Sequence, residues 1–348
     1  MKRIGLDIGA TQVRVAEVEL SGKGAGTGTL TAFAHADLPP GAVQAGEVHD
    51  VSAVGTAIKQ AVQAGGFTTK EVVLGIGSAN VMVRETDLPS MPMAQLRSSL
   101  PFQVQDVLTM PASEAMLDFY PTAERDGDGT KMLRGVVVAA PKSIVGQHVL
   151  AVENAGLRPK MVDLSAFALL RSQLAGEAAG KIAAIVDIGS RVTTVVVAQQ
   201  GVPRLVRILP SGGQDMTAAI ASSMRMDHSE AENVKRSMGL GAAMSPEYQP
   251  AQEALGQAAR SLVESIRNTF VFYSQANPGA PVEHVIITGG GSQLNGLGQF
   301  LASASRTPVS FGNAFARVVP GKKLSRESLT GFEVRAAMAV GLAFGEAS

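Results

Sequence analysis

Two aspartates that lie half the chain apart sit in the same short pattern, and they are the clearest candidates for chemistry in the sequence. Residues 4–19 spell IGLDIGATQVRVAEVE and residues 184–199 spell AIVDIGSRVTTVVVAQ, so Asp7 and Asp187 hold equivalent places. In both segments an apolar strand ends in Asp-Ile-Gly, and a short turn leads into a second strand. Apolar strands on both sides of a turn predict a β-hairpin. The sequence therefore predicts a duplicated unit, with one such hairpin opening each half of the chain.

The turn of each hairpin has the residue types of a phosphate-binding loop. A glycine follows each aspartate by two positions and lets the backbone pass close to an anion. Successive turn amides can then point at phosphate oxygens, and a hydroxyl in each turn can add a donor. We therefore predict phosphate contacts from both turns. The predicted contacts are Gly9, Ala10, Thr11 and Gln12 in the first hairpin and Gly189, Ser190 and Arg191 in the second.

The aspartates themselves predict a metal ion. If the two halves of the fold face one cleft, Asp7 and Asp187 point at the same place, where two carboxylates repel each other unless a cation lies between them. Mg²⁺ keeps several waters and takes one or two carboxylates together with phosphate oxygens. We therefore predict that Asp7 and Asp187 hold the Mg²⁺ of a magnesium nucleotide, through water.

A third glycine-rich segment follows in the second half of the chain. Residues 285–297 spell VIITGGGSQLNGL, in which an apolar strand runs into three glycines, a polar residue and a predicted helix that includes residues 299–301. Bare backbone in such a turn lets a flat base or ribose pack against it, and a helix N-terminus favours phosphate. The predicted contacts are Gly289, Gly290, Gly291 and Ser292.

These three features, in this order, resemble the phosphate 1, phosphate 2 and adenosine motifs of the actin, Hsp70 and sugar-kinase ATPase superfamily. The resemblance implies an α/β fold, a duplicated actin-like (ribonuclease H-like) two-lobe fold, with ATP and Mg²⁺ between the lobes. It also implies that Gly212 and Gly213 lie beside the nucleotide and that Glu232 and Lys235 approach the ribose. An exposed, solvated helix is the alternative for the Glu232 and Lys235 pair.

The region between the two hairpins indicates which branch of this superfamily the sequence resembles. Residues 84–92 spell RETDLPSMP and residues 100–102 spell LPF, and this run is similar to the PilM family of type IV pilus assembly proteins, which are relatives of FtsA. Further similar segments are VDLSAFALLR at 162–171, SGGQDMTAAIA at 211–221, AENVK at 231–235 and AVGLA at 339–343. The resemblance implies a small 1C-type subdomain inserted into the first lobe.

The same resemblance implies a division of the chain and a partner. The N-terminal cytoplasmic peptide of the inner-membrane protein PilN would dock in a groove between the first lobe and the inserted subdomain. The implied segments are 1–80 (lobe 1 core, 1A), 81–155 (inserted subdomain, 1C), 156–180 (return to the lobe 1 core), 181–213 (lobe 2 core, 2A), 214–278 (lobe 2 outer subdomain, 2B), 279–329 (lobe 2 core) and 330–348 (C-terminal helix returning to lobe 1).

Two helices can be predicted from their apolar periodicity. Asp50 can cap a helix in which residues 54, 58 and 62 share one face, and the adjacent glycines 65 and 66 would stop it. A long helix is predicted over residues 251–273, where apolar side chains recur at helical spacing. Both apolar faces are expected to lie in the core.

Hydrolysis of ATP requires a group that orients the attacking water. By resemblance to filament-forming relatives, Asp163 stands where they have a glutamate, and Val192 stands where they have the first threonine of the second hairpin. A valine cannot position water, whereas a register shifted by one residue would bring Thr193 to that place. Arg191 in the same turn can hold the phosphates by charge. We therefore expect slow or negligible turnover, with ATP acting as a structural ligand.

Two other functions on the same scaffold stay open. A small-molecule kinase would need a catalytic base, for which Asp163 is the one candidate. An FtsA-like filament-forming protein would carry a C-terminal amphipathic membrane helix, which the last residues do not suggest. Self-association is left open.

Composition excludes several further classes. Lys plus Arg and Asp plus Glu are 30 each, so no basic field predicts nucleic acid as a partner. The chain has no cysteine, and its five histidines are far apart, so a cysteine or histidine metal site is not expected. No apolar run is long enough to cross a bilayer. We therefore expect a cytoplasmic protein that reaches the inner face of the membrane through partners.

Overall fold

The first of two large sheets contains the N-terminal hairpin. In the computed structural model, which describes residues 2–21, 26–126, 131–241 and 245–345, this sheet has the strand order β10-β6-β1-β2-β3-β16. The pairs β1–β2 and β2–β3 are antiparallel, whereas β6, β10 and β16 join in parallel. The strands are β1 (Lys2–Ile8), β2 (Gln12–Leu20), β3 (Gly28–Asp37), β6 (Glu71–Ile76), β10 (Arg158–Leu164) and β16 (Val318–Pro320).

The second sheet repeats the plan of the first. Its order is β13-β12-β11-β14-β15, again with an antiparallel hairpin, an antiparallel third strand and two parallel strands on the other side. The predicted duplication and the two-lobe α/β fold are therefore confirmed. The strands are β11 (Ile182–Ile188), β12 (Thr193–Gln199), β13 (Val202–Leu209), β14 (His284–Thr288) and β15 (Val309–Phe311).

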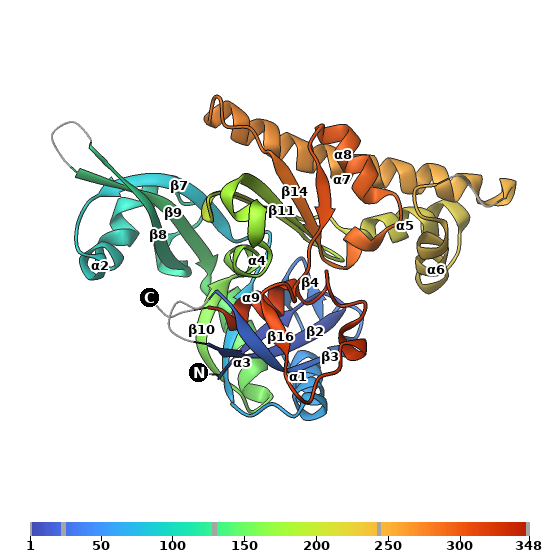
Figure 1. Cartoon of the computed structure of the whole chain (residues 1–348), viewed down its shortest axis with the longest axis horizontal. Coiled ribbons are helices and arrows are strands. Elements are labelled where there is room, and N and C mark those ends of the chain that lie inside the picture. Colours follow the sequence, from blue (N-terminus) through green and yellow to red (C-terminus); the bar gives the residue numbers. More distant parts are fainter. Residues whose placement is uncertain (1, 22–25, 127–130, 242–244, 346–348) are drawn as a thin grey trace.

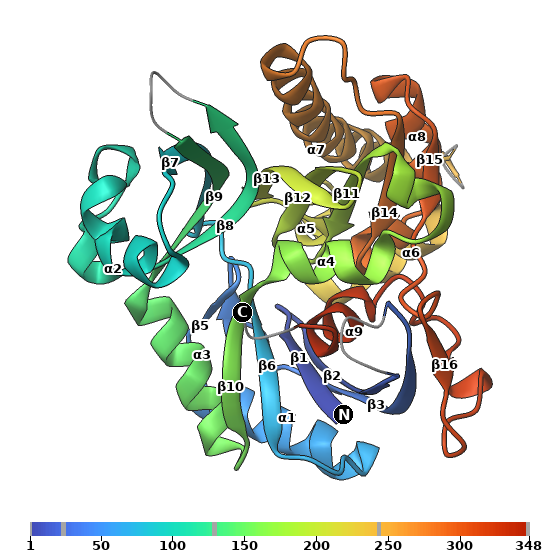
Figure 2. The ribbon, with the colours of Figure 1, turned by 60° about the vertical axis from the view of Figure 1, so that its left-hand side comes forward.

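Two short helices lie between the sheets (Figures 1 and 2). The helix α4 (Ser165–Gln173) carries the chain from the first sheet to the second, and α9 (Ala337–Ala343) follows its return. They pack against each other, α9 against β1, β2 and β6, and α4 against β11, β12 and β13. The helix predicted for the C-terminus is thus shorter than the segment 330–348, of which residues 346–348 lie outside the described part.

Helices cover the outer faces of both sheets. The helix α1 (Val51–Gly65) begins where the Asp50 carboxylate accepts a hydrogen bond from the amide of Ala53, and it ends at Gly66 in the left-handed region, as the sequence predicts. The long helix α7 (Gln249–Ala276) buries its apolar stripe, which confirms that prediction. The other helices of the two lobes are α3 (Lys142–Asn154), α5 (Gly213–Met224), α6 (His228–Met238), which packs on α5, and α8 (Leu297–Ser305).

A small three-stranded sheet is inserted between β6 and α3 and projects to one side of the molecule (Figure 1). Its core contains Leu96, Leu100 and Phe119, with Met91, Met93 and Met110 packed at the edge. Its elements are β7 (Met82–Pro89), α2 (Met93–Gln103), β8 (Ala115–Asp126) and β9 (Lys131–Pro141). Elsewhere the structure has the short hairpin β4 (Val43–Gln44) and β5 (Glu47–Val48), and 3-10 turns at Gln105–Val107, Ala112–Glu114, Gly176–Gly180, Pro246–Tyr248, Gly290–Gln293 and Glu327–Leu329.

Two predicted segment boundaries differ from this arrangement. The inserted unit is shorter than 81–155, because α3 packs on α1 and buries Val145 and Val152 in the core of the first lobe. The second-lobe segment 279–329 is too long, because β16 pairs with β3 in the first sheet. The other boundaries stay predictions. No helix in the described residues combines the length and apolarity that crossing a lipid bilayer needs.

Candidate functional site

The first hairpin closes tightly below its tip. The amide of Gly9 donates to the carbonyl of Gln12 at 3.0 Å, and Asp7 pairs across the hairpin with Arg14. The two residues at the tip, Ala10 and Thr11, are free of this pairing. The register therefore leaves the tip amides available and places the Asp7 side chain beside them.

The second hairpin has the same geometry. The amide of Gly189 donates to the carbonyl of Val192 at 2.9 Å, and Asp187 pairs with Thr194, which is equivalent to position 14. Two-residue tips and equal registers confirm that the hairpins are structural copies. The Arg191 side chain lies exposed at the tip of this second copy.

The two aspartates face one another closely enough to interact. Burial and the negative charge of Asp7 raise the pKa of Asp187 to about 7. Burial also raises the pKa of Asp7, against the lowering effect of Arg14. The two hairpins therefore bring together a pair of carboxyl groups of which only one is readily ionised, as expected for like charges at one place.

Arg14 is a residue that the sequence interpretation did not single out. One guanidinium nitrogen lies 3.1 Å from Oδ2 of Asp7, and a Cβ added at Gly9 would come within 3.4 Å of the same group. The side chain is largely buried, and its Nε has no partner among the described residues. Residues opposite each other in a hairpin share a face, so the pairing of positions 7 and 14 could have been predicted from the hairpin register.

The second hairpin is held against the start of α5. The amide of Gly213 donates to the carbonyl of Gly189 at 2.9 Å, and the amide of Gln214 donates to the carbonyl of Ser190 at 2.8 Å. The Ser190 hydroxyl also donates to the Gln214 side chain at 2.9 Å. A Cβ at Gly212 would lie 2.5 Å from the carbonyl oxygen of Gly189. Backbone packing of this closeness requires glycine and rigidly positions the turn.

The three-glycine turn reaches the same place. Gly289 has φ of +83°, and a Cβ there would lie 2.8 Å from Oδ1 of Asp187. A Cβ at Gly291 would lie 3.1 Å from the carbonyl oxygen of Gly189, whereas one at Gly290 would meet nothing within 4 Å. The turn therefore packs on the second hairpin through two glycines and leaves the third facing open space.

The predicted helix start after the glycines is wrong. A 3-10 turn, Gly290–Gln293, follows directly, and α8 begins only at Leu297, after Gly296 with φ of +87°. Residues 292–296 therefore separate the three glycines from the N-terminus of α8. Ser292 is fully buried and its hydroxyl donates to the carbonyl of Gly289 at 2.7 Å, so it stabilises the turn from inside.

Lys235 and Glu232 form an ion pair on α6. The Lys235 ammonium lies 2.6 Å from Oε2 of Glu232 and donates to the hydroxyl of Thr217 at 2.7 Å and to the carbonyl of Gly213 at 3.0 Å. Although burial acts to raise it, hydrogen bonds from Lys235, Thr217 and Arg236 lower the pKa of Glu232. Lys235 is buried, so the exposed-helix alternative is wrong for that residue. The pair therefore lies against the start of α5, beside Gly213.

The structure places both residues proposed to orient water in other contacts. Asp163 forms a close ion pair with Arg171, which also donates to the carbonyl of Gly341 in α9 at 3.0 Å. Thr193 is fully buried, and its hydroxyl donates to the carbonyl of Ser211 at 2.8 Å. Both side chains therefore link backbone segments of the fold.

The residues present fit a nucleotide better than a metal held by protein alone. Turn amides, Arg14 and open space at Gly290 suit phosphates and a base beside them. No group of three or more His, Asp or Glu side chains in the described residues could hold a metal ion. Two carboxyl groups still match the needs of Mg²⁺ when phosphate oxygens and waters complete its shell.

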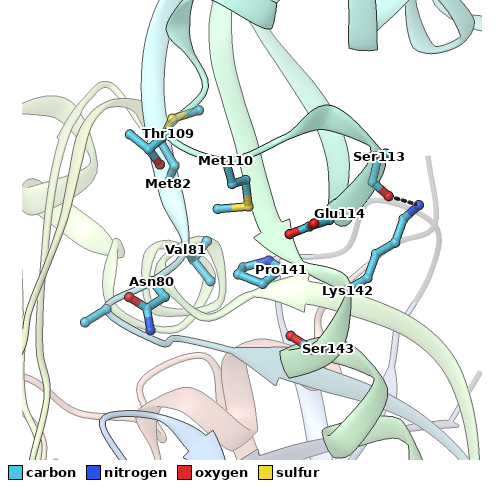
Figure 3. Close-up of a pocket in the computed structure, with 11 residues that line it drawn as sticks. Asn80, Val81, Met82, Thr109, Met110, Ser113, Glu114, Pro141, Lys142 and Ser143 are labelled. Atoms are coloured by element: carbon cyan, nitrogen blue, oxygen red, sulfur yellow. Dashed lines mark hydrogen bonds between the residues drawn. The ribbon is translucent and has the colours of Figure 1, made fainter.

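A hollow lies away from the two hairpins, between the inserted unit and α3 (Figure 3). Its volume is about 770 Å³, and Lys142 closes one side by donating to the carbonyl of Ser113 at 2.8 Å. Its lining combines apolar side chains with a few polar ones. The lining residues are Ala79, Asn80, Val81, Met82, Thr109, Met110, Ser113, Glu114, Pro141, Lys142 and Ser143.

The duplicated sheets and opposed hairpins define an actin-like protein. A solved structure of MreB5 of Spiroplasma citri bound to ADP superposes with a TM-score of 0.52 at 11% identity, covering 98% of this chain and 94% of that one, which shows the fold alone. The sequence matches the family described as type IV pilus assembly protein PilM over residues 5–347. The chain belongs to this family, and through it to the actin-like ATPase superfamily.

Two further comparisons agree with this assignment. A solved PilM-PilN type IV pilus biogenesis complex contains a chain that is 26% identical, with a TM-score of 0.85 and 99% and 98% of the two chains covered. The cell division protein FtsA of Bacillus subtilis is 23% identical over 261 residues, which are 68% of this chain. The match spans only 58% of the length of that FtsA, so FtsA's activities do not transfer with it.

Proposed function

We propose that this type IV pilus assembly protein is an ATP-binding scaffold that turns its nucleotide over slowly or not at all. The main observation in support of this proposal is the pair of equivalent hairpins, whose aspartates interact with each other. An arrangement that gathers two sets of tip amides and a positive guanidinium at one point is suited to a chain of phosphates.

The predicted contacts take distinct roles in this proposal. The tip amides and Arg14 hold the phosphates, with Arg191 able to reach them from its exposed position. Asp7 and Asp187 hold Mg²⁺ through water, and the metal neutralises phosphate charge when bound. The open face at Gly290 receives the adenosine. The paired side chains of Glu232 and Lys235 lie beside the ribose.

Slow turnover follows from the contacts of the water-orienting candidates. Asp163 is neutralised by Arg171, and the Thr193 hydroxyl is used by the backbone. A carboxylate oxygen that is held in an ion pair with a guanidinium is not free to accept a hydrogen bond from an attacking water. We propose that bound ATP sets the separation of the lobes and that its hydrolysis is not used to drive a reaction.

The hollow beside α3 is proposed as the docking site of the PilN N-terminal peptide. It lies between the first lobe and the inserted unit, where the peptide groove is expected, and Val81, Met82, Met110 and Pro141 line it. Flexible thioethers adapt to an extended apolar peptide. A partner of this kind would bring a cytoplasmic protein to the inner face of the membrane.

Calorimetric titration of the purified protein with Mg-ATP tests the proposal. We expect one ATP per chain and, after prolonged incubation, recovery of most nucleotide uncleaved by chromatography. Turnover in the usual enzymatic range of about 1–10³ s⁻¹ would contradict the scaffold role and favour a kinase or a filament ATPase. Absence of binding would contradict the proposal at its base.

A further inference from the structure

Two arginines from opposite ends of the chain meet at one neutral oxygen beside the first hairpin turn. Arg14 lies on β2, and Arg335 lies directly before α9. A nitrogen of Arg14 donates to Oε1 of Gln12 at 3.4 Å, and Nη2 of Arg335 donates to the same oxygen. The two guanidinium groups are therefore neighbours, although 321 residues separate them in the sequence.

The orientation of the Gln12 amide is fixed by its surroundings. Its nitrogen donates to Oδ1 of Asp37 at 2.7 Å, while its oxygen faces the two arginines. The reverse orientation would set an N–H₂ group against two further donors and an oxygen against a carboxylate. Gln12 therefore separates Asp37 from the arginines and offers them a neutral acceptor in place of a charge.

Arg335 is held in place without an ion pair among the described residues. Its guanidinium carbon lies 5.0 Å from the ring centroid of Phe332, and the side chain is partly buried. Burial and the positive charges of Arg14 and Arg236 lower the pKa of Arg335, which shows that cations from both lobes lie near it. Arg14 pairs with the carboxylate of Asp7, and Arg236 pairs with that of Glu232. No carboxylate among the described residues pairs with Arg335.

We propose that Arg335, held beside Arg14 by the Gln12 side chain, is a specificity-determining ligand for the phosphate groups of the nucleotide. The inference rests on the proposed ATP binding and deepens it. Asp37 lies near Arg335 without pairing with it, so a phosphate chain can supply the ion-pair partner that Arg335 does not have among the described residues. Guanidinium groups bind phosphate oxygens through charge-assisted hydrogen bonds. Arg335 therefore makes affinity depend on the phosphates rather than on the adenosine.

The test compares Arg335→Ala with the wild-type chain by calorimetry against ATP, ADP, adenosine and tripolyphosphate. We expect at least about tenfold weaker binding of ATP, ADP and tripolyphosphate, and unchanged binding of adenosine. Arg317→Ala is the matched control, because Arg317 is also partly buried, stacks 5.6 Å from a ring centroid, here Phe344, and donates to backbone carbonyls. It should leave the ratio of ATP to adenosine affinity unchanged.

Gln12→Glu tests the charge argument while it keeps both arginines. A carboxylate at position 12 would neutralise the pair internally, so ATP affinity should fall about as far as in Arg335→Ala, whereas the melting temperature without ligand should rise. If Arg335 acted only as a structural group, Gln12→Glu would lower the affinity for ATP by the same factor in the wild-type chain and in Arg335→Ala, because only Arg14 would then be neutralised.

The outcomes separate this inference from the function it rests on. If the wild-type chain and Arg335→Ala bind ATP equally well, the role proposed for Arg335 is wrong and the scaffold proposal is unaffected. Equal losses for ATP and adenosine in Arg335→Ala also overturn it. If the wild-type chain binds neither ATP nor tripolyphosphate, both the role of Arg335 and the scaffold proposal are wrong.

Discussion

Gly341 of α9 lies directly against the backbone carbonyl of Ala168 in α4: a Cβ at position 341 would lie 1.9 Å from that oxygen. Because these helices carry the chain between the two lobes, the contact sets how closely the lobes are joined. Any side chain at this position must push the helices apart, since the atom it would meet belongs to the backbone and cannot rotate away.

Gly341→Ala should therefore destabilise the protein strongly. Overpacking of this kind costs about 1–3 kcal/mol, which would appear as a lower midpoint in urea denaturation. Gly146→Ala in α3 is the matched control, because its Cβ would meet nothing within 4 Å. There the loss of glycine freedom should raise the free energy of unfolding by about 0.5–1 kcal/mol. Equal effects of the two substitutions would contradict the close α4–α9 contact.

Asp187 should lower the stability of the ligand-free protein as the pH rises. Its pKa is raised from 3.8 to about 7 in the folded state, so the folded chain binds more protons between these values. The contribution of Asp187 to stability is therefore greatest below about pH 4 and falls as the pH rises to 7. Because the carboxyl group is partly accessible, we expect a loss of about 2 kcal/mol.

Asp187→Asn should remove this loss. The variant should unfold at a higher urea concentration than wild type at pH 8 and at a similar one at pH 4, while it loses affinity for Mg-ATP. A variant that is less stable than wild type at pH 8 would show that the ionised carboxylate is stabilising and that the predicted sign is wrong.

Gly290 should be needed for nucleotide binding and not for folding. A Cβ at position 290 meets nothing in the structure, whereas one at Gly291 would lie 2.6 Å from the side chain of Ile188. Gly290→Ala should unfold like wild type yet bind ATP at least about tenfold more weakly, because the added methyl occupies the space proposed for adenosine. Gly291→Ala should lose stability as well. Unchanged ATP affinity in Gly290→Ala would place the adenosine elsewhere.

Local patterns carried most of what could be predicted. The hairpins around Asp7 and Asp187 and the helix capped by Asp50 depend on neighbours in sequence, so turn chemistry and periodicity were sufficient. The segment after Gly289 is ambiguous in the sequence, because a strand, glycines and an apolar run fit both a helix start and a 3-10 turn.

Pairs made by tertiary folding could not be predicted. Asp163 resembled a water-orienting residue, and only the packing of α4 against β10 brings Arg171 onto it. Arg335 lies far from Gln12 in the sequence, and no local signal connects them. Contacts between residues that meet only because the chain returns to the first lobe can therefore be found only from the structure.

Met110 should be needed for peptide binding and not for ATP binding. It lines the hollow beside α3, where Met110→Asp would place a charge among apolar side chains. A fluorescent peptide with the N-terminal sequence of PilN should bind the variant at least about tenfold more weakly by anisotropy. Phe102→Asp is the control, because Phe102 lies in the same inserted unit and is 81% exposed outside the hollow. Equal losses for both variants would contradict the proposed groove.

Glu17 should make the first lobe sensitive to acid. It is 1% exposed and accepts hydrogen bonds from the Thr31 hydroxyl at 2.6 Å and from the Thr68 amide at 2.8 Å, which joins β2, β3 and the segment before β6. Although burial acts to raise it, these hydrogen bonds lower the pKa of Glu17 below 4.5. Its stabilising effect is therefore complete above pH 4.5 and is lost as the pH falls through the lowered pKa.

Glu17→Gln should reduce the free energy of unfolding by about 2 kcal/mol at pH 7, because the amide N–H₂ cannot accept from both Thr31 and Thr68. The difference from wild type should shrink as the pH is lowered to 3, where wild-type Glu17 is becoming protonated. Glu19→Gln is the control on the same strand, since Glu19 is exposed, and it should change stability little at either pH. A difference between Glu17→Gln and wild type that is constant from pH 7 to pH 3 would mean that the loss comes from packing and not from the charge.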